Sequence, residues 1–187
     1  MVLRLFAIGL LFTWMFVDSM IVFGRRGRQA RSAERLSLFV IILTSWAGTW
    51  LGILVSFAFS GVPRSLVVPM QATGFLIMVT GIVVRSTAIA QLGRFHMPSV
   101  TIQEGHRVID TGLYRSIRHP SYLGASIAYL GFGLALGSLV SAVIVTATTM
   151  AGYVYRMKVE ERALLEALGA EYADYRRRTC RLIPGIY

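Results

Sequence analysis

The chain has 187 residues, of which 55% are hydrophobic and only 15% charged, and its mean hydropathy is +0.63. This composition is too apolar for an ordinary soluble domain and predicts a single membrane domain over residues 1–187. The net charge of +10 would suit a nucleic-acid-binding protein, but the basic residues gather between apolar runs, which argues against nucleic acid and favours membrane lipids as surroundings.

Three apolar stretches in the first half of the chain are long enough to cross a bilayer, because a helix needs about 20 apolar residues to span the hydrocarbon. They cover residues 2–23, 36–59 and 66–90. A signal peptide is the alternative for the first stretch, but the apolar run is longer than such a peptide requires. Asp18 and Arg85 lie toward the same end of their stretches, and we expect an intramembrane ion pair between them that fixes helix packing.

The second half of the chain contains 35 consecutive uncharged residues, 121–155. This stretch is too long for one span and somewhat short for two. Gly137 and Ser138 lie near its middle and favour a turn, so we expect a tight hairpin with arms at 121–136 and 139–155. The fold class is therefore all-α, a polytopic membrane protein with about five transmembrane helices.

The basic residues indicate an orientation in the membrane. All but two of them, Arg4 and Arg64, lie in the segments 24–35 and 85–118 and in the tail from residue 156. The positive-inside rule then places the N-terminus outside and the C-terminus in the cytoplasm. The composition is like that of a prokaryotic protein, and we expect a bacterial or archaeal cell membrane.

Two segments are expected to be soluble and cytoplasmic. Residues 91–120 are interrupted by glycine and proline and predict an irregular loop. Residues 156–178 predict an amphipathic C-terminal helix that continues the fifth span and breaks at Gly169.

A polar cluster, Arg118-His119-Pro120-Ser121-Tyr122, begins the hairpin. Pro120 suits the first turn of a helix, where its missing N–H costs nothing. Free N–H groups at that helix start attract an anion, and His119 and Tyr122 are placed to add hydrogen bonds. The alternative is an ordinary belt of polar and aromatic residues at the membrane interface.

A second polar cluster follows the hairpin. Arg156 and Glu160 are four residues apart and share a helix face, with Glu161 beside them. An acid there suits the ammonium group of an amino-acid-like cofactor, and the arginine suits a carboxylate or phosphate. A structural salt bridge is the alternative.

Metal and disulfide chemistry find little support in the sequence. His96, His106 and His119 are spaced unlike a compact ligand set, so no metal is expected. Cys180 is the only cysteine, which excludes an intramolecular disulfide.

Longer patterns in the second half of the chain occur together in a known family. The first runs Gly105-His106-Arg107-Val108-Ile109-Asp110-Thr111-Gly112-Leu113-Tyr114 and continues with Arg118-His119-Pro120-Ser121-Tyr122-Leu123-Gly124. Then follow Arg156-x-x-x-Glu160-Glu161, Leu168-Gly169-x-Glu171-Tyr172-x-x-Tyr175 and a basic end with a proline. In this order they resemble the isoprenylcysteine carboxyl methyltransferase family. The match covers about residues 91–184, half of the chain.

The resemblance implies an integral-membrane methyltransferase that uses S-adenosylmethionine without a Rossmann domain. It assigns residues 91–187 to the catalytic part and residues 1–90 to substrate access. Arg156 would face the acceptor group, and Glu160 would bind the amino group of the cofactor; these two are the catalytic candidates. Ser99 replaces a glutamine that touches the cofactor in some relatives, which puts that contact in doubt. The remaining implied cofactor-binding residues are His106, Arg107, Val108, Ile109 and Tyr114 around the adenosine, and His119, Pro120, Ser121 and Tyr122 at the methionine end.

The implied reaction is carboxyl O-methylation of an isoprenylcysteine-like substrate, which is a lipophilic small molecule or a lipidated partner. A carboxylate acceptor needs no base, so the protein would align the reactants and exclude water. The alternatives are a phospholipid N-methyltransferase, a small-thiol methyltransferase, an NADPH-dependent membrane reductase with the same hairpin motif, and a non-enzymatic membrane scaffold.

Overall fold

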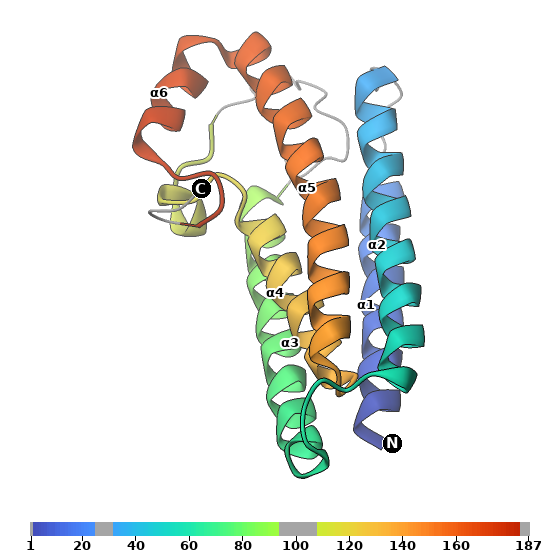
Figure 1. The fold of residues 1–187 in the computed structure, drawn as a ribbon. Helices are drawn as coiled ribbons and strands as arrows, with labels where there is room; N and C mark the ends of the chain where they lie inside the picture. The colour runs from blue at the N-terminus through green and yellow to red at the C-terminus, as the bar shows by residue number, and fades with distance from the viewer. Residues whose placement is uncertain (1, 25–31, 94–107, 184–187) are drawn as a thin grey trace.

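A computed structural model of the protein describes residues 2–24, 32–93 and 108–183 (Figure 1). These residues form helices, and the only β-type pairing among them is a bridge between Ile117 and Cys180. In chain order the elements are α1 (Val2–Gly24), α2 (Ser32–Ala58), α3 (Arg64–Leu92), the 3-10 helix η2 (Gly112–Arg115), α4 (Pro120–Ala135), α5 (Leu139–Leu168) and α6 (Ala170–Arg178).

The three predicted N-terminal spans are confirmed as helices, each within four residues of its expected bounds. Four helices of the described chain, α1, α2, α3 and α5, are long and apolar enough to cross a membrane. Helix α4 has only 16 residues, or about 24 Å of helix, which is less than the hydrocarbon thickness. The chain is thus an integral membrane protein of helical fold, and the count of five spans stays a prediction.

The predicted hairpin is confirmed, with its turn at Gly137 and Ser138. Gly137 has a φ of 79°, a left-handed conformation that favours glycine. The Ser138 hydroxyl then accepts a hydrogen bond from the Ser141 N–H at 3.2 Å and caps α5. Helix α5 continues past the apolar stretch to Leu168, and the break at Gly169 separates it from α6, as expected.

Glycines bring α3 and α4 together with almost no side chain between them. A Cβ added to Gly131 would lie 2.2 Å from the Met78 nitrogen, and one added to Gly81 would lie 2.3 Å from the Ala128 nitrogen. Gly133 makes the same kind of contact with Ala142 of α5. These small residues let the helices pack closely, and α4 is held between α3 and α5 (Figure 1).

The intramembrane ion pair between Asp18 and Arg85 is also confirmed. Arg85 donates from Nε and Nη2 to the two carboxylate oxygens of Asp18, at 2.8 and 2.7 Å. Its Nη1 reaches the carbonyl oxygen of Ser121 at 3.3 Å. One buried arginine therefore joins α1, α3 and the first turn of α4.

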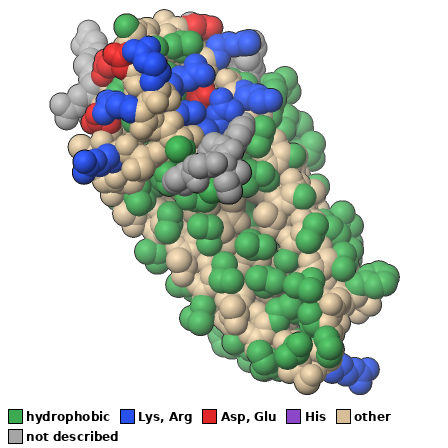
Figure 2. Space-filling model, turned by 60° about the vertical axis from the view of Figure 1, so that its left-hand side comes forward, with side chains coloured by type: hydrophobic (Ala, Val, Ile, Leu, Met, Phe, Trp, Pro, Cys, Tyr) green, Lys and Arg blue, Asp and Glu red, His purple; other side chains and the backbone are tan. Residues whose placement is uncertain are grey.

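Charged side chains gather at one end of the molecule. Figure 2 shows Lys, Arg, Asp and Glu at that end, above flanks covered by hydrophobic side chains. Phe6, Phe57 and Leu76 are among the hydrophobic residues that are more than 60% exposed, which suits contact with lipid. This distribution agrees with the orientation predicted from the basic residues, which itself stays a prediction.

Candidate functional site

A cavity of about 170 Å³ lies among the helices near the charged end. Its polar lining comes mainly from η2, α4 and α5, with the Asp18–Arg85 pair of α1 and α3, and its aromatic and apolar lining comes mainly from α1 and α2. The polar part includes Tyr114, Arg118, His119, Ser121, Tyr122, Arg156 and Glu160; the apolar part includes Trp14, Met15, Leu38, Ile41, Ile42 and Trp46.

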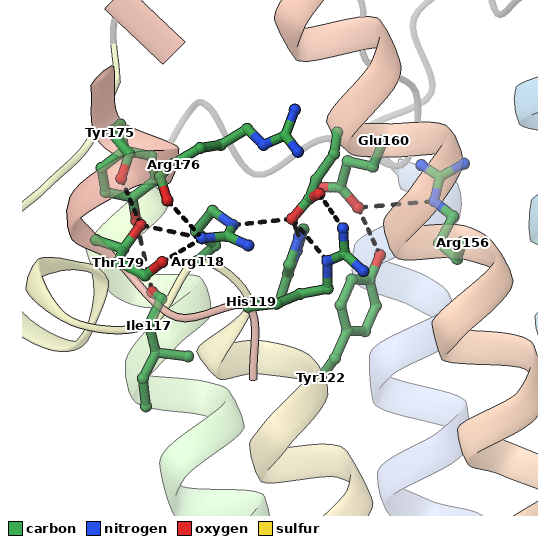
Figure 3. A network of polar contacts seen from close by, with 11 residues as sticks. Ile117, Arg118, His119, Tyr122, Arg156, Glu160, Tyr175, Arg176 and Thr179 are labelled. Atoms are coloured by element: carbon green, nitrogen blue, oxygen red, sulfur yellow. Dashed lines mark hydrogen bonds and ion pairs between the residues drawn. The ribbon is translucent and has the colours of Figure 1, made fainter. Parts of the chain in front are cut away.

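Arg156, Glu160 and Tyr122 form a group at the polar part of the wall (Figure 3). The Tyr122 hydroxyl donates to Glu160 Oε2 at 2.8 Å. Arg156 Nε lies 3.9 Å from the same oxygen, so the predicted i, i+4 pair is formed. The Glu160 side chain keeps 26% of its surface exposed, which leaves the carboxylate room to accept a further hydrogen bond.

The Arg156 side chain is 2% exposed. Its Nη1 donates to the Ser37 hydroxyl of α2 at 2.7 Å. A buried guanidinium is costly unless it is paired, so Ser37 and Glu160 together hold Arg156 beside the cavity. Ser37 carries no signal in the sequence that would have indicated this contact.

Glu161 has entirely different neighbours from Glu160. Its Oε1 accepts from Arg118 Nε at 2.9 Å, from Arg181 Nε at 3.1 Å and from His119 Nε2 at 3.2 Å. Its Oε2 accepts from Arg181 Nη2 at 2.7 Å. The side chain is 4% exposed. Glu161 therefore closes a buried ion cluster and does not line the cavity.

His119 is the residue before α4, and Pro120 occupies the first turn, as predicted. The N–H groups of Tyr122 and Leu123 both donate to the His119 carbonyl oxygen at 3.1 Å. The His119 N–H donates to Arg181 O at 3.1 Å. The helix start therefore offers an anion fewer free N–H groups than the sequence suggested, because the chain itself occupies them.

Tyr114 lies in η2 and is 4% exposed, with its ring in the cavity wall. Its hydroxyl is buried and makes no hydrogen bond within the described residues. Burial, followed by the nearby Glu160 carboxylate, raises the pKa of the Tyr114 phenol above its usual value. The Tyr114 hydroxyl thus stays protonated and is available as a donor to a ligand.

The predicted cofactor-binding residues fall into three groups. Tyr114, His119, Ser121, Tyr122 and Glu160 line the cavity, as does the predicted substrate-binding residue Arg156. Val108, Ile109 and Pro120 are not in its wall; the Val108 N–H instead donates to Glu171 Oε1 of α6 at 3.0 Å. His106 and Arg107, like Ser99 and His96, lie outside the described residues.

The sequence did not point to several residues of the cavity wall. Trp14 of α1 packs against Tyr129 of α4 with ring centroids 5.5 Å apart, and Tyr153 of α5 packs against Tyr122 at 5.0 Å. Ser45 of α2 adds a buried hydroxyl. Within a membrane span, each of these residue types is also common in ordinary helix packing, so the sequence alone does not mark them as part of a site.

Comparison with known proteins gives a consistent picture. A model of the isoprenylcysteine carboxyl methyltransferase family matches residues 73–166. A protein-S-isoprenylcysteine O-methyltransferase of Schizosaccharomyces pombe is 32% identical over 135 residues, which is 71% of this chain and 54% of that protein. Protein-S-isoprenylcysteine O-methyltransferase B of Arabidopsis thaliana is 29% identical over 60% of this chain and 58% of its own length.

A solved structure agrees with these matches. The eukaryotic intramembrane Ras methyltransferase ICMT superposes with a TM-score of 0.56 and 25% identity, over 80% of this chain and 52% of that one. The chain thus spans about half the length of the relatives it matches. These relatives are eukaryotic, so they give no support to a bacterial or archaeal source.

Proposed function

Because the chain belongs to the isoprenylcysteine carboxyl methyltransferase family, we propose that it is an integral-membrane methyltransferase. Its methyl donor is S-adenosylmethionine, and its acceptor is the carboxylate of a lipophilic, isoprenylcysteine-like substrate. One observation carries the proposal: Arg156, Glu160 and Tyr122 line the same cavity as aromatic and apolar side chains of the lipid-embedded helices α1 and α2.

The polar residues of the cavity wall carry the chemical groups that the cofactor needs as partners. Glu160 is an acid with accessible surface that suits an ammonium group, and the buried Tyr114 hydroxyl has a proton to donate. His119, Ser121 and Tyr122 stand beside them in the same wall. When bound, S-adenosylmethionine would supply a methyl group on a cationic sulfur. His106, Arg107, Val108 and Ile109 are assigned to the adenosine on the resemblance alone.

Arg156 is the residue that we assign to binding the carboxylate of the acceptor. A guanidinium binds a carboxylate through two parallel hydrogen bonds, and Ser37 and Glu160 already restrict how Arg156 turns. Arg156 would hold the acceptor carboxylate with one oxygen toward the methyl group that the cofactor supplies, and the products would be a methyl ester and a neutral thioether. The carboxylate is already the nucleophile, so no proton needs to be removed. Alignment and exclusion of water are then the work of the protein.

The lipophilic part of the acceptor belongs on the side of Trp14, Ile41, Ile42 and Trp46, where α1 and α2 meet the bilayer. We place the charged end of the molecule in the cytoplasm, so the polar cofactor reaches the cavity from water and the acceptor reaches it from lipid. Residues 91–187 thus carry the chemistry, and residues 1–90 admit the acceptor.

The test is calorimetric binding of S-adenosylhomocysteine to the full chain in detergent, with Glu160→Gln beside the wild type. We expect micromolar binding by the wild type and at least about a tenfold loss in the variant, because an ammonium loses its charged partner. Glu166→Gln is the matched control, since Glu166 is exposed on the same helix and outside the cavity wall.

Absence of binding by folded wild type contradicts the proposal. If binding is found, transfer of labelled methyl to an S-farnesylated N-acetylcysteine follows, with the methyl ester of the same molecule as a blank that has no free carboxylate. Labelling of both compounds to the same extent would contradict a carboxylate acceptor.

A further inference from the structure

The C-terminal segment, residues 179–182, lies against residues 116–119, which form the elbow between η2 and α4. Its main chain pairs with the elbow through three hydrogen bonds: Cys180 N–H to Ser116 O at 2.9 Å, Arg118 N–H to Cys180 O at 2.8 Å, and His119 N–H to Arg181 O at 3.1 Å. Leu182 is 2% exposed and belongs to the hydrophobic core. This segment follows the residues that the family model matches.

Side chains connect the same segment to the elbow a second time. Arg118 Nη1 donates to the carbonyl oxygens of Arg176 and Thr179, which Figure 3 shows beside it. Arg181 donates from two nitrogens to both oxygens of Glu161, a fork that fixes the plane of the carboxylate. The Arg181 side chain is 20% exposed, and Glu161 is 4% exposed.

The orientation of Glu161 determines what His119 can offer to the cavity. An ionised carboxylate only accepts hydrogen bonds, so the ring of His119 presents an Nε2 proton to Glu161 Oε1, 3.2 Å away. A ring with one proton then has its lone pair on Nδ1. The ring also packs against Tyr122, with centroids 5.6 Å apart, and Tyr122 in turn donates to Glu160.

We propose that Arg181 is a positioning residue for His119. By holding the Glu161 carboxylate and, through its own carbonyl, the His119 N–H, it sets the tautomer and the direction of an imidazole in the cofactor half of the cavity. The role in ligand binding rests on the proposed function; the control of the ring does not. The C-terminal segment is in this sense part of the site, although none of residues 179–182 lines the cavity.

The first experiment measures the ring nitrogens directly. The chain has three histidines, so ¹⁵N-histidine spectra of the detergent-solubilised protein are simple, and the signal missing from a His119→Asn sample identifies His119. We expect a single Nε2–H tautomer in the wild type and a mixture of tautomers in Arg181→Gln. Arg181→Lys keeps the charge and one hydrogen bond, and we expect it to restore most of the wild-type spectrum.

The second experiment measures affinity for S-adenosylhomocysteine. We expect Arg181→Gln to raise its Kd about tenfold, through the loss of a charge-assisted pair that holds a binding residue, and Arg181→Lys to recover part of this loss. Arg177→Gln is the matched control: Arg177 is on the same end of the molecule, is 75% exposed and pairs with Asp174, and the variant should match the wild type in both readouts.

A merely structural role predicts a different result, in which Arg181→Gln lowers the unfolding temperature but leaves the tautomer and the Kd unchanged; that result overturns the proposal. If Arg181→Gln does not fold, the Kd of Arg181→Lys decides: we expect a value between the wild-type Kd and one about tenfold higher, and a Kd identical to the wild type overturns the proposal. A wild type that binds no S-adenosylhomocysteine refutes the proposed function, while the ring spectra still test the effect of Arg181 on His119.

Discussion

Glu160 and Glu161 are neighbours on α5, yet the regions around them differ in nearly every respect. Glu160 faces the cavity with a quarter of its side chain exposed, one hydroxyl donor and one guanidinium nearby. Glu161 faces the C-terminal segment, is almost fully buried and accepts four hydrogen bonds from three cationic or imidazole side chains. A step of one residue along α5 therefore separates a region that is open to a ligand from a region that is already occupied by the protein.

This difference teaches that a pair of adjacent acids need not act as a pair. Burial of Glu161 is tolerable because both carboxylate oxygens accept hydrogen bonds from buried or partly buried donors, whereas Glu160 keeps capacity for a further hydrogen bond. The region around Glu160 is expected to contact the ligand directly, whereas the region around Glu161 is expected to hold the fold together and to act on the ligand only through His119. Substitutions on the two sides should separate these effects.

Arg156→Lys should give the largest effect on the Glu160 side. Lysine keeps the charge but has no planar fork and cannot reach Ser37 and an acceptor carboxylate in the same geometry, so we expect kcat/KM to fall about 100-fold. The measurement is methyl transfer at varied acceptor concentration, with the Kd for S-adenosylhomocysteine as the companion readout, which should stay within about twofold. The exposed Lys158→Arg is the control. A loss of cofactor affinity equal to the loss of activity would argue against Arg156 as the acceptor's partner.

Glu161→Gln should lower the thermal stability of the protein much more than Glu160→Gln does. It leaves Arg118 and Arg181 without their shared anion in a buried place, and breaking such a pair costs on the order of 3 kcal/mol. We therefore expect the midpoint of thermal unfolding to fall by about 5 to 10 °C, whereas Glu160→Gln shifts it by less than about 2 °C. Equal shifts in the two variants would remove the distinction between the regions. Scanning fluorimetry in one detergent makes the comparison.

Tyr122→Phe should give the smallest effect and sharpens the boundary between the two regions. The change removes a hydroxyl that donates to Glu160 at 2.8 Å but keeps the ring stacked between His119 and Tyr153. We expect the Kd for S-adenosylhomocysteine to rise about threefold to fivefold, without a change in unfolding temperature. Tyr155→Phe, on an exposed ring of the same bundle, should have no effect. A lower unfolding temperature for Tyr122→Phe would place Tyr122 with the structural region instead.

Much of the architecture follows from local patterns in the sequence. Apolar runs predicted α1, α2, α3 and the hairpin, because a membrane demands long apolar helices whatever they pack against. Gly137 predicted the turn, and two charges inside apolar runs predicted the pair between Asp18 and Arg85.

The site was predicted only in part, because its remaining contacts depend on tertiary structure. The hydrogen bond from Arg156 to Ser37 joins residues 119 positions apart, and nothing near Ser37 marks it. The same holds for the aromatic wall from α1 and for the fork from Arg181 to Glu161. Val108 was assigned to the adenosine by resemblance, and it contacts α6 here. The motifs indicated the chemistry of the polar wall, whereas the packing that completes the cavity needed the fold.

The glycine contacts between α3 and α4 have a mechanical consequence. Where two helix backbones touch without side chains between them, neither can slide or rotate without a collision, so α3, α4 and the turn that carries His119 move as one body. A guest too large for a cavity of about 170 Å³ must then be accommodated by the opposite wall. Helix α1 meets this body through side chains, namely the Asp18–Arg85 ion pair, the Trp14–Tyr129 ring contact and buried core residues such as Leu11, so it is the wall that can yield.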